Sequence, residues 1–335
     1  MHRVRNSPKI LKISSIRVPN RFRRYLERIK CLLIISVLML LFSEVLAVSA
    51  QPIAFGEFEV GSKLVYRLSG VYIGNKTYEF LALENQQGKT CIRVRVKLDV
   101  RTQGGLLSEG TSYVSEFCYD EKGKPVSQRM EVPPEINSSI REVEVIYQWG
   151  EGYFPNKAII TLHREGNITE LYELDMNKGR GIQIIGNEKV EFSFSPDNLS
   201  QILPFVPEAL IMPHIDLSSL ELKKGFEKIL GEGVRGITLK VMGSDYIETP
   251  AGKFECYIVL LKGVDEYGIP YNSTIYITKA RPRFTVMYET NSIGVKQYGY
   301  LVEYYTPRKI STKLLFVLFM LLISIVVLII IKKYR

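Results

Sequence analysis

The clearest strand in this chain is Cys91-Ile92-Arg93-Val94-Arg95-Val96-Lys97-Leu98-Asp99-Val100-Arg101. Apolar and charged side chains alternate along it, and a period of two is typical of a β-strand with one buried face and one solvated face. Gly104-Gly105 follows, a dipeptide that supplies the positive φ angles of a two-residue hairpin turn. The stretch therefore predicts the first strand of an antiparallel hairpin.

A turn centred on Gly104-Gly105 also predicts which residues face each other across the hairpin. It places Arg93 opposite Glu116 and Cys91 opposite Cys118. Directly opposed residues in an antiparallel ladder lie close enough for a disulfide, so we expect one between these two cysteines. The alternative is a pair of free thiols, because a wider turn within Gln103–Gly110 would change the register.

Further strands are expected between turn signals such as Glu121-Lys122-Gly123-Lys124. They are Leu64–Ile73, Thr77–Leu83, Val126–Val132, Glu142–Gln148, Ala158–His163, Ile168–Leu174, Val190–Phe194, Ile237–Val241, Phe254–Leu261, Ser273–Thr278, Phe284–Tyr288 and Gln297–Tyr304. Many short strands with few helices predict a mainly β fold, arranged as an antiparallel meander, a sandwich or a half-open barrel.

One amphipathic helix is expected over Ser218–Leu230, because Ser218 and Glu221 form a capping box ahead of apolar residues at helical spacing. The preceding segment Ile202–Ile215 is apolar, but its three prolines prevent a continuous helix. It is interpreted as a connection that covers the core, with a mobile lid or a partner-binding loop as alternatives. A junction between two subdomains would fall near residues 200–235.

Two apolar runs bracket the chain. Residues 1–50 combine a basic leader, the apolar run Cys31–Phe42 and a short polar stretch, which is the pattern of a signal peptide cleaved after Ala50. An uncleaved anchor is the alternative. Residues 309–335 contain Leu314–Ile331, an uninterrupted apolar run long enough for a transmembrane helix with a short cytoplasmic tail. These runs predict a single-pass protein of the cell membrane with residues 51–308 as an extracytoplasmic β-rich domain.

The distribution of charge argues against nucleic acid as a partner. The excess of basic over acidic residues that raises the pI to 9.2 lies in the two flanks, whereas residues 51–308 are mildly acidic. A nucleic-acid interface would show clustered Lys and Arg on one element. The lipid bilayer, reached through Leu314–Ile331, is the partner that the sequence predicts.

Five N-x-Ser/Thr sequons occur in the exported part, and none has proline at the middle position. In an extracytoplasmic domain they are candidates for N-linked glycosylation. Their acceptors are Asn75, Asn137, Asn167, Asn198 and Asn272.

The exported part contains no recognisable catalytic motif. Its two histidines, His163 and His214, are far apart in sequence and have no zinc-ligand spacing, so no metal and no cofactor are expected. Cys256 lies in an apolar strand without a nearby histidine, which favours a buried inert thiol over a nucleophile. Gly179-Arg180-Gly181 is interpreted as a turn rather than a phosphate-binding loop. Paired carboxylates for glycoside hydrolysis remain open, because their spacing is set only by folding.

The densest aromatic patch is the candidate contact surface. It comprises Tyr147, Trp149, Tyr153 and Phe154, whose rings could stack on a sugar or an apolar ligand. A hairpin tip whose rings pack back on the sheet is the structural alternative.

Two segments resemble exported β-rich envelope proteins of bacteria and archaea. Phe58–Tyr66, with Val60-Gly61 and Tyr66, is similar to their opening strand, and Glu248–Tyr257, with Thr249-Pro250-Ala251-Gly252, is similar to a recurring hairpin that Ser273–Tyr304 would follow. Many of those families have no known activity, and some resemble the half-open barrels of lipoprotein carriers such as LolA, which hold an acyl chain between sheet and helix. The resemblance implies an exported β fold and transfers no functional residue.

The leading hypothesis is a membrane-anchored extracytoplasmic protein that binds a ligand or an envelope component without catalysis. Its partner would be an apolar ligand, a glycan or an envelope protein. The alternatives are an exported hydrolase that acts on glycans or peptides, and an accessory subunit of a membrane complex.

Overall fold

The computed structural model describes residues 53–102, 110–134, 139–195, 199–203, 206–211, 213–231, 236–264, 270–292 and 295–307. The chain divides into two compact units, Met1–Ala47 and Val48–Arg335, and every described residue belongs to the second. The predicted signal segment and the predicted membrane helix Leu314–Ile331 lie outside the described residues. Among the described residues, no helix has both the length and the apolar character needed to cross a bilayer.

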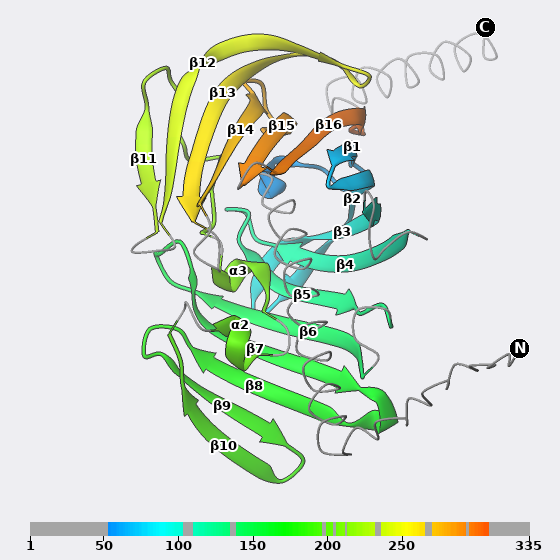
Figure 1. Cartoon of the computed structure of the whole chain (residues 1–335), viewed down its shortest axis with the longest axis vertical. Coiled ribbons are helices and arrows are strands. Elements are labelled where there is room, and N and C mark those ends of the chain that lie inside the picture. Colours follow the sequence, from blue (N-terminus) through cyan, green and yellow to red (C-terminus); the bar gives the residue numbers. More distant parts are fainter. Residues whose placement is uncertain are drawn as a thin grey trace, which may run out of the picture. The chain divides into compact units, whose positions relative to one another are not determined.

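The described part of the second unit is one antiparallel sheet of sixteen strands (Figure 1). The first ten are β1(Lys63–Gly70), β2(Tyr72–Gln86), β3(Lys89–Thr102), β4(Thr111–Tyr119), β5(Pro125–Glu131), β6(Ile140–Trp149), β7(Pro155–Arg164), β8(Thr169–Asp175), β9(Arg180–Ile185) and β10(Glu188–Ser193). The last six are β11(Glu227–Leu230), β12(Ile237–Thr249), β13(Gly252–Val264), β14(Pro270–Thr278), β15(Thr285–Ser292) and β16(Val295–Tyr305). Helical structure in the described residues is limited to η1(Phe55–Glu57), η2(Glu165–Asn167), α2(Leu199–Ile202) and α3(Glu208–Ile211).

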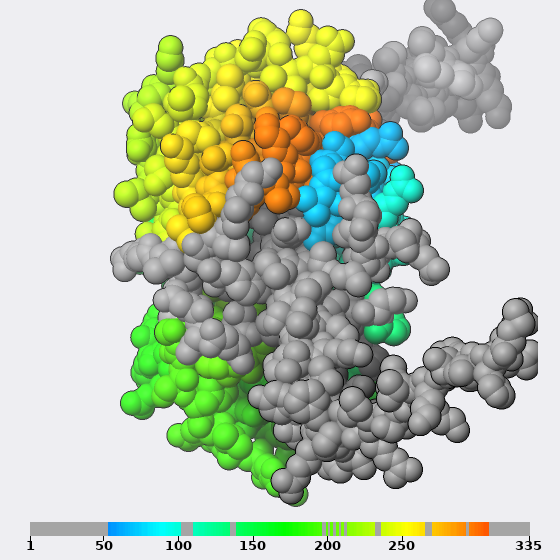
Figure 2. Space-filling model, in the orientation of Figure 1, coloured from blue at the N-terminus to red at the C-terminus, as the bar shows by residue number. Residues whose placement is uncertain are grey.

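The first and last strands meet in the middle of the sheet. Consecutive strands pair as a meander in each half, and β1 pairs with β16, so that Lys63 lies opposite Tyr305. Figure 2 shows the blue N-terminal strands directly against the orange C-terminal strands. The two free edges of the sheet are consequently β10 and β11, which follow each other in sequence.

Residues 194–226 join these two edges and are called the strap here. The strap contains α2 and α3 and buries a row of leucines, Leu199, Leu203, Leu210, Leu217, Leu220 and Leu222. The Nη1 atom of Arg283 donates to the carbonyl oxygens of Leu217 and Leu220, at 2.7 Å each. The apolar strap is therefore fastened to the turn that precedes β15.

The amphipathic helix expected over Ser218–Leu230 is not formed. The Oδ1 atom of Asp216 accepts hydrogen bonds from the amide and hydroxyl of Ser218, and Gly225 adopts a φ of +84°. A left-handed residue ends helical winding, and Glu227–Leu230 then pair with β12 as strand β11. The prediction was wrong because the β12 edge offers these residues a ladder that the local pattern does not reveal.

Alternating burial explains why most of the strands form where the sequence predicts them. β1 buries Leu64, Tyr66 and Leu68, and β12 buries Ile237, Leu239 and Val241, while the residues between them are more exposed. A side-chain period of two directs these apolar side chains to one face of the sheet.

The opposite face carries a row of alternating charge that crosses six strands in direct register. From β1 to β6 the row reads Lys63, Glu79, Arg95, Glu116, Arg129 and Glu144. The Nη2 atom of Arg95 lies 2.7 Å from Oε1 of Glu116. Opposite charges that face each other across a ladder stabilise the pairing, so this row contributes to the stability of the observed register.

The structure contains the expected disulfide between Cys91 and Cys118, with the two Cα atoms 5.4 Å apart. The register around it differs from the expected one by two residues, because Arg93 rather than Cys91 lies opposite Cys118. Glu116 accordingly faces Arg95 instead of Arg93. The disulfide joins diagonal neighbours on the two strands.

Candidate functional site

The aromatic patch singled out in the sequence borders a cavity of about 550 Å³, called the Trp149 pocket here. Volumes of this order are typical of ligand sites. Four segments form it, namely η1, the β2–β3 hairpin, the β4–β5 turn and the end of β6. Its lining residues are Gly56, Phe58, Leu83, Lys89, Thr90, Cys91, Ile92, Tyr119, Asp120, Glu121, Lys122, Lys124, Trp149 and Gly150.

One wall of the pocket is built on the disulfide. Cys91 and Cys118 form a buried cluster with Val126, which ties the β2–β3 hairpin to β4 and β5. Next to it, the rings of Phe55 and Tyr119 stack with centroids 3.8 Å apart. A covalent link and a ring stack hold this wall in place before any ligand arrives.

Gly56 lets η1 pack closely against the β4–β5 turn. A Cβ atom at this position would collide with the carbonyl oxygen of Glu121. Because backbone cannot move aside as a flexible side chain does, only glycine fits here without a shift of the turn.

The ring of Trp149 is fixed from three directions. Its Nε1 atom donates to the carbonyl oxygen of Pro125 at 2.6 Å, and the Nζ atom of Lys124 lies 5.0 Å from the ring centroid. The imidazole of His214, on the strap, meets it edge to face at 5.8 Å. A preorganised aromatic ring loses little entropy when a ligand stacks on it.

Lys124 anchors the β4–β5 turn to the β6–β7 loop. Its Nζ atom donates to the carbonyl oxygens of Gly150 at 3.0 Å and Gly152 at 3.3 Å. Burial lowers the pKa of Lys124, and the positive charges of Lys122 and Lys89 act in the same direction against the raising effect of Asp120 and Asp216. Lys89 and Lys122 form no salt bridge within the described residues, so their charges are available to a ligand.

The two carboxylates of the pocket are neighbours in sequence. The Oδ1 atom of Asp120 accepts hydrogen bonds from the backbone amides of Lys122 at 3.0 Å and Lys124 at 2.8 Å. Asp120 therefore shapes the turn, and Glu121 is exposed. With three lysines against these two acids, the pocket has a formal net charge of +1.

His214 links the strap to this site. Its Nε2 atom donates to the carbonyl oxygen of Lys122 at 3.0 Å, and its backbone amide donates to the carbonyl oxygen of Tyr153 at 2.8 Å. Burial is the main cause that lowers the pKa of His214, and it outweighs the opposing hydrogen bond and the charge of Asp216.

Of the four aromatic residues singled out in the sequence, only Trp149 lines the pocket. Tyr147 is buried, and its hydroxyl donates to the side-chain oxygen of Gln128 at 2.8 Å. Tyr153 is half-buried beneath the Nζ atom of Lys228, 5.7 Å from its ring centroid, and Phe154 is half-buried as well. Patterning did not reveal the three lysines and Tyr119, because they come together only through the hairpin and the turn.

The remaining candidate residues lie away from the pocket. His163 is on the charged face, where its Nε2 atom is 3.7 Å from Oε2 of Glu144. Cys256 is buried, and burial raises the pKa of its thiol to about 12. In the part of the chain that the structure describes, no three His, Cys, Asp or Glu side chains come together as metal ligands would.

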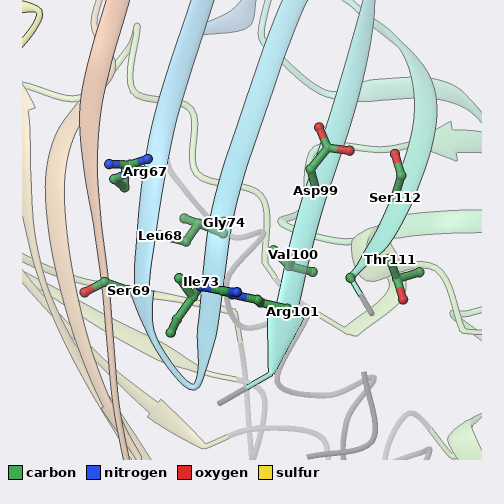
Figure 3. A pocket seen from close by; sticks show the side chains of 11 residues that line it. Arg67, Leu68, Ser69, Ile73, Gly74, Asp99, Val100, Arg101, Thr111 and Ser112 are labelled. Atoms are coloured by element: carbon green, nitrogen blue, oxygen red, sulfur yellow. The ribbon is translucent and has the colours of Figure 1, made fainter. Parts of the chain in front are cut away.

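A second cavity, of about 640 Å³, lies at the ends of β1 to β4 (Figure 3). Asp99 faces Ser112 across one ladder and Arg101 faces Ile73 across another, as the side chains in Figure 3 show. This cavity has no aromatic side chain among its lining residues. The Trp149 pocket is the better candidate because it combines a fixed ring with unpaired positive charge.

No family model matches the chain, and no curated protein matches it. Among solved structures, it is similar to a protein assigned as exported, with a YmcC-like fold, from Bacteroides fragilis NCTC 9343. The two share 10% identity over 76% of this chain and 100% of that one, with a TM-score of 0.27.

Two other solved structures are similar to a comparable extent. A β-barrel-like protein of the domain of unknown function DUF1849 from Brucella abortus shares 10% identity over 75% of this chain and 99% of that one, with a TM-score of 0.34. A protein assigned as a lipoprotein, from Parabacteroides distasonis ATCC 8503, shares 10% identity over 76% of this chain and 100% of that one, with a TM-score of 0.29. With TM-scores this low, none of the three bears on the site.

Proposed function

We propose that this chain is an extracytoplasmic protein, tethered to the membrane by Leu314–Ile331, that binds an anionic glycan of the cell envelope without catalysis. The binding site is the Trp149 pocket. The observation that carries the proposal is the fixed ring of Trp149 beside Lys89 and Lys122, whose charges are unpaired among the described residues.

The chemistry of the pocket suits a sugar that bears carboxylate or phosphate groups. The faces of aromatic rings stack on the apolar faces of sugar rings, and ammonium groups attract the acidic substituents. Leu83, which is 67% exposed, extends the apolar part of the rim. A neutral sugar would contact the aromatic ring but would not interact with the lysine charges. An anionic sugar would interact with both the ring and the charges.

Residence outside the cytoplasm rests on two features of different origin. The sequence begins with a signal-like pattern that precedes the exported part. The Cys91–Cys118 disulfide is of a kind that persists in oxidising compartments and is rare in the cytosol.

A hydrolase at the same site would need two carboxylates that converge from opposite sides of a bound sugar. The pocket offers Asp120 and Glu121, which are adjacent in sequence, and Asp120 is engaged by two amides of its own turn. This arrangement favours binding over bond cleavage. An accessory subunit of a membrane complex is the other alternative, and co-purification from gently solubilised membranes would reveal its partner.

The proposal is tested by calorimetric titration of the full chain in detergent micelles with polygalacturonate, an acidic glycan, and with dextran, a neutral one. We expect the acidic polymer alone to bind, and rising salt to weaken the binding because exposed charges are screened. Trp149→Ala and the double variant Lys89→Glu/Lys122→Glu are each expected to lower the affinity at least about tenfold. A tenfold loss corresponds to roughly 1.4 kcal/mol of binding free energy.

Two matched variants control for general effects on the surface. Tyr246→Ala removes an aromatic ring that is 61% exposed on β12, and Lys189→Glu reverses an exposed charge on β10. Both are expected to bind like the unaltered chain. Equal binding of dextran, or full affinity in Trp149→Ala, would refute the proposal, and new reducing ends in the polymer would establish the hydrolase instead.

A further inference from the structure

Exposure alone does not distinguish the sequons of this chain. The structure describes the acceptors of three, Asn75, Asn167 and Asn272, and all three side chains are exposed. Asn137 and Asn198 lie outside the described residues. What separates the three is the conformation of the backbone that carries them.

Asn75 lies near the start of β2, where this strand is paired on both sides. It faces Arg67 on β1 and Asp99 on β3, and the middle residue of its sequon, Lys76, is 3% exposed. The sequon is therefore held straight by ladders on both sides.

Asn272 is held in the same way. It faces Lys262 on β13 and Asn291 on β15. The middle residue of its sequon, Ser273, is 6% exposed and shares a hydrogen bond of 2.8 Å with Thr290. Bending either of these sequons would break the pairing of three strands.

Asn167 lies instead at the tip of the β7–β8 turn. Gly166 and Asn167 have φ angles of +76° and +59°, and the amide of Arg164 closes the turn by donating to the carbonyl oxygen of Ile168 at 2.8 Å. All three residues of the sequon, Asn167, Ile168 and Thr169, are exposed. The chain is already bent here, and within the described residues Thr169 is the one member of the sequon in a ladder, paired on one side with His163 of β7.

We propose that Asn167 carries an N-linked oligosaccharide and that Asn75 and Asn272 do not. The transfer requires the asparagine amide and the hydroxyl residue two positions later to enter one enzyme site together, which an exposed turn permits and a doubly paired strand does not. This inference rests on the extracytoplasmic location in the proposed function, but not on ligand binding at the Trp149 pocket.

The donor is a polyprenyl-phosphate-linked oligosaccharide, and the catalyst is a membrane oligosaccharyltransferase. The Nδ2 atom of Asn167 attacks C1 of the first sugar and forms the N–C bond. The C1–O bond to phosphate breaks, the polyprenyl phosphate leaves with its electron pair, and the amide loses one proton to a base of the transferase. No oxidant or reductant is needed.

A glycan at Asn167 would leave the Trp149 pocket open. Trp149 is the last residue of β6, whereas the turn that carries Asn167 follows the opposite end of the β6–β7 hairpin. The length of β6 separates the two ends by about 30 Å, at about 3.3 Å per residue. The modification and the ligand would therefore occupy opposite ends of this hairpin.

The test is mass spectrometry of tryptic peptides from the full chain, purified from membranes of the cells that naturally make it. Trypsin separates the three sites, because Leu68–Lys76, Gly263–Lys279 and Glu165–Lys178 each contain one sequon acceptor. We expect a glycan mass on Glu165–Lys178 with at least about tenfold higher occupancy than on the other two peptides. An unmodified Asn167, or comparable occupancy at Asn75 or Asn272, would overturn the inference.

A matched pair of variants separates modification from folding. Thr169→Ala destroys the sequon and leaves Asn167 in its turn, whereas Thr169→Ser keeps the sequon. We expect the first to lose the glycan and the second to retain it, with both binding polygalacturonate as the unaltered chain does. Glycan on Asn167 in a chain that fails to bind polygalacturonate would support this inference while refuting the proposed ligand, so the two failures are distinguishable.

Discussion

The imidazole of His214 meets the indole of Trp149 edge to face, with ring centroids 5.8 Å apart. The first ring belongs to the strap that joins the free edges of the sheet, and the second belongs to the wall of the pocket. Trp149 is the only tryptophan in the chain, so its fluorescence reports on this contact without interference.

Acidification is expected to destabilise the fold through His214. Burial lowers the pKa of this group below its ordinary value of 6.5, so the unfolded chain takes up the proton first. The free energy of unfolding should therefore be level above about pH 7.5 and fall as the pH drops through about 6.5 toward the lowered value. Urea unfolding followed by Trp149 fluorescence at several pH values measures this slope.

Two glutamine variants control the pH experiment. His214→Gln should remove the slope between about pH 7 and 5, whereas His163→Gln, a change on the charged face, should keep it. The charges that oppose or assist the shift at His214 come from Asp216, Asp120 and Lys124, all of which remain in both variants. An identical slope in the two variants would contradict this role of His214.

The disulfide should contribute substantially to stability. It closes a loop with a sequence separation of 27 residues, and chain-entropy reasoning gives about 3.5 kcal/mol for a loop of this size. Cys91→Ser/Cys118→Ser should therefore unfold at markedly lower urea concentration, and polygalacturonate affinity should fall because Cys91 lines the pocket. Adding a reductant should lower the urea midpoint of the unaltered chain toward that of the variant and leave the midpoint of the variant unchanged. An unchanged midpoint in the unaltered chain would refute the prediction.

Reversal of one charge in the row across β1 to β6 should be costly. Glu116→Lys places a positive charge between Arg95 and Arg129, which face it from both sides, and we expect a loss of roughly 1 kcal/mol in unfolding free energy. Adding Arg95→Glu should restore part of the loss. Glu191→Lys on edge strand β10, where Ile182 is the opposite residue, is the matched control and should change little.

The register of the β3–β4 hairpin could not be predicted from the sequence pattern alone. A shift by two residues exchanges Arg93 for Arg95 opposite Glu116 and Ile92 for Val94 opposite Phe117. Both arrangements pair charge with countercharge and apolar with apolar, because alternation is unchanged by any even shift. The two cysteines are near each other in either register, so the expected pairing did not depend on the exact one.

Other differences arose where distant segments decide local structure. Gly179-Arg180-Gly181 was interpreted as a turn, and Gly179 does lie in the β8–β9 turn with a φ of +60°. Arg180 and Gly181, however, belong to β9, where a Cβ atom on Gly181 would collide with the ring of Phe192. The glycine is present because an aromatic side chain on the next strand covers it. Likewise, Glu227–Leu230 pair with β12 as β11, although the apolar spacing over Ser218–Leu230 predicted a helix.

The candidate site was predictable only in part. The aromatic patch pointed to Trp149, because a dense run of rings is visible in a single stretch of sequence. Lys89, Lys122 and Tyr119 are separated from it by more than twenty positions and reach it through the hairpin, the disulfide and the β4–β5 turn. Convergence of this kind depends on sheet order, which local patterns do not contain.

Binding at the Trp149 pocket is tested most directly by the emission of Trp149 in the full chain during titration with polygalacturonate. If the ligand stacks on this ring, we expect a saturable change in intensity or wavelength whose midpoint equals the calorimetric dissociation constant and moves to higher concentration with added salt. Binding that saturates while the emission of this single tryptophan stays unchanged would contradict it.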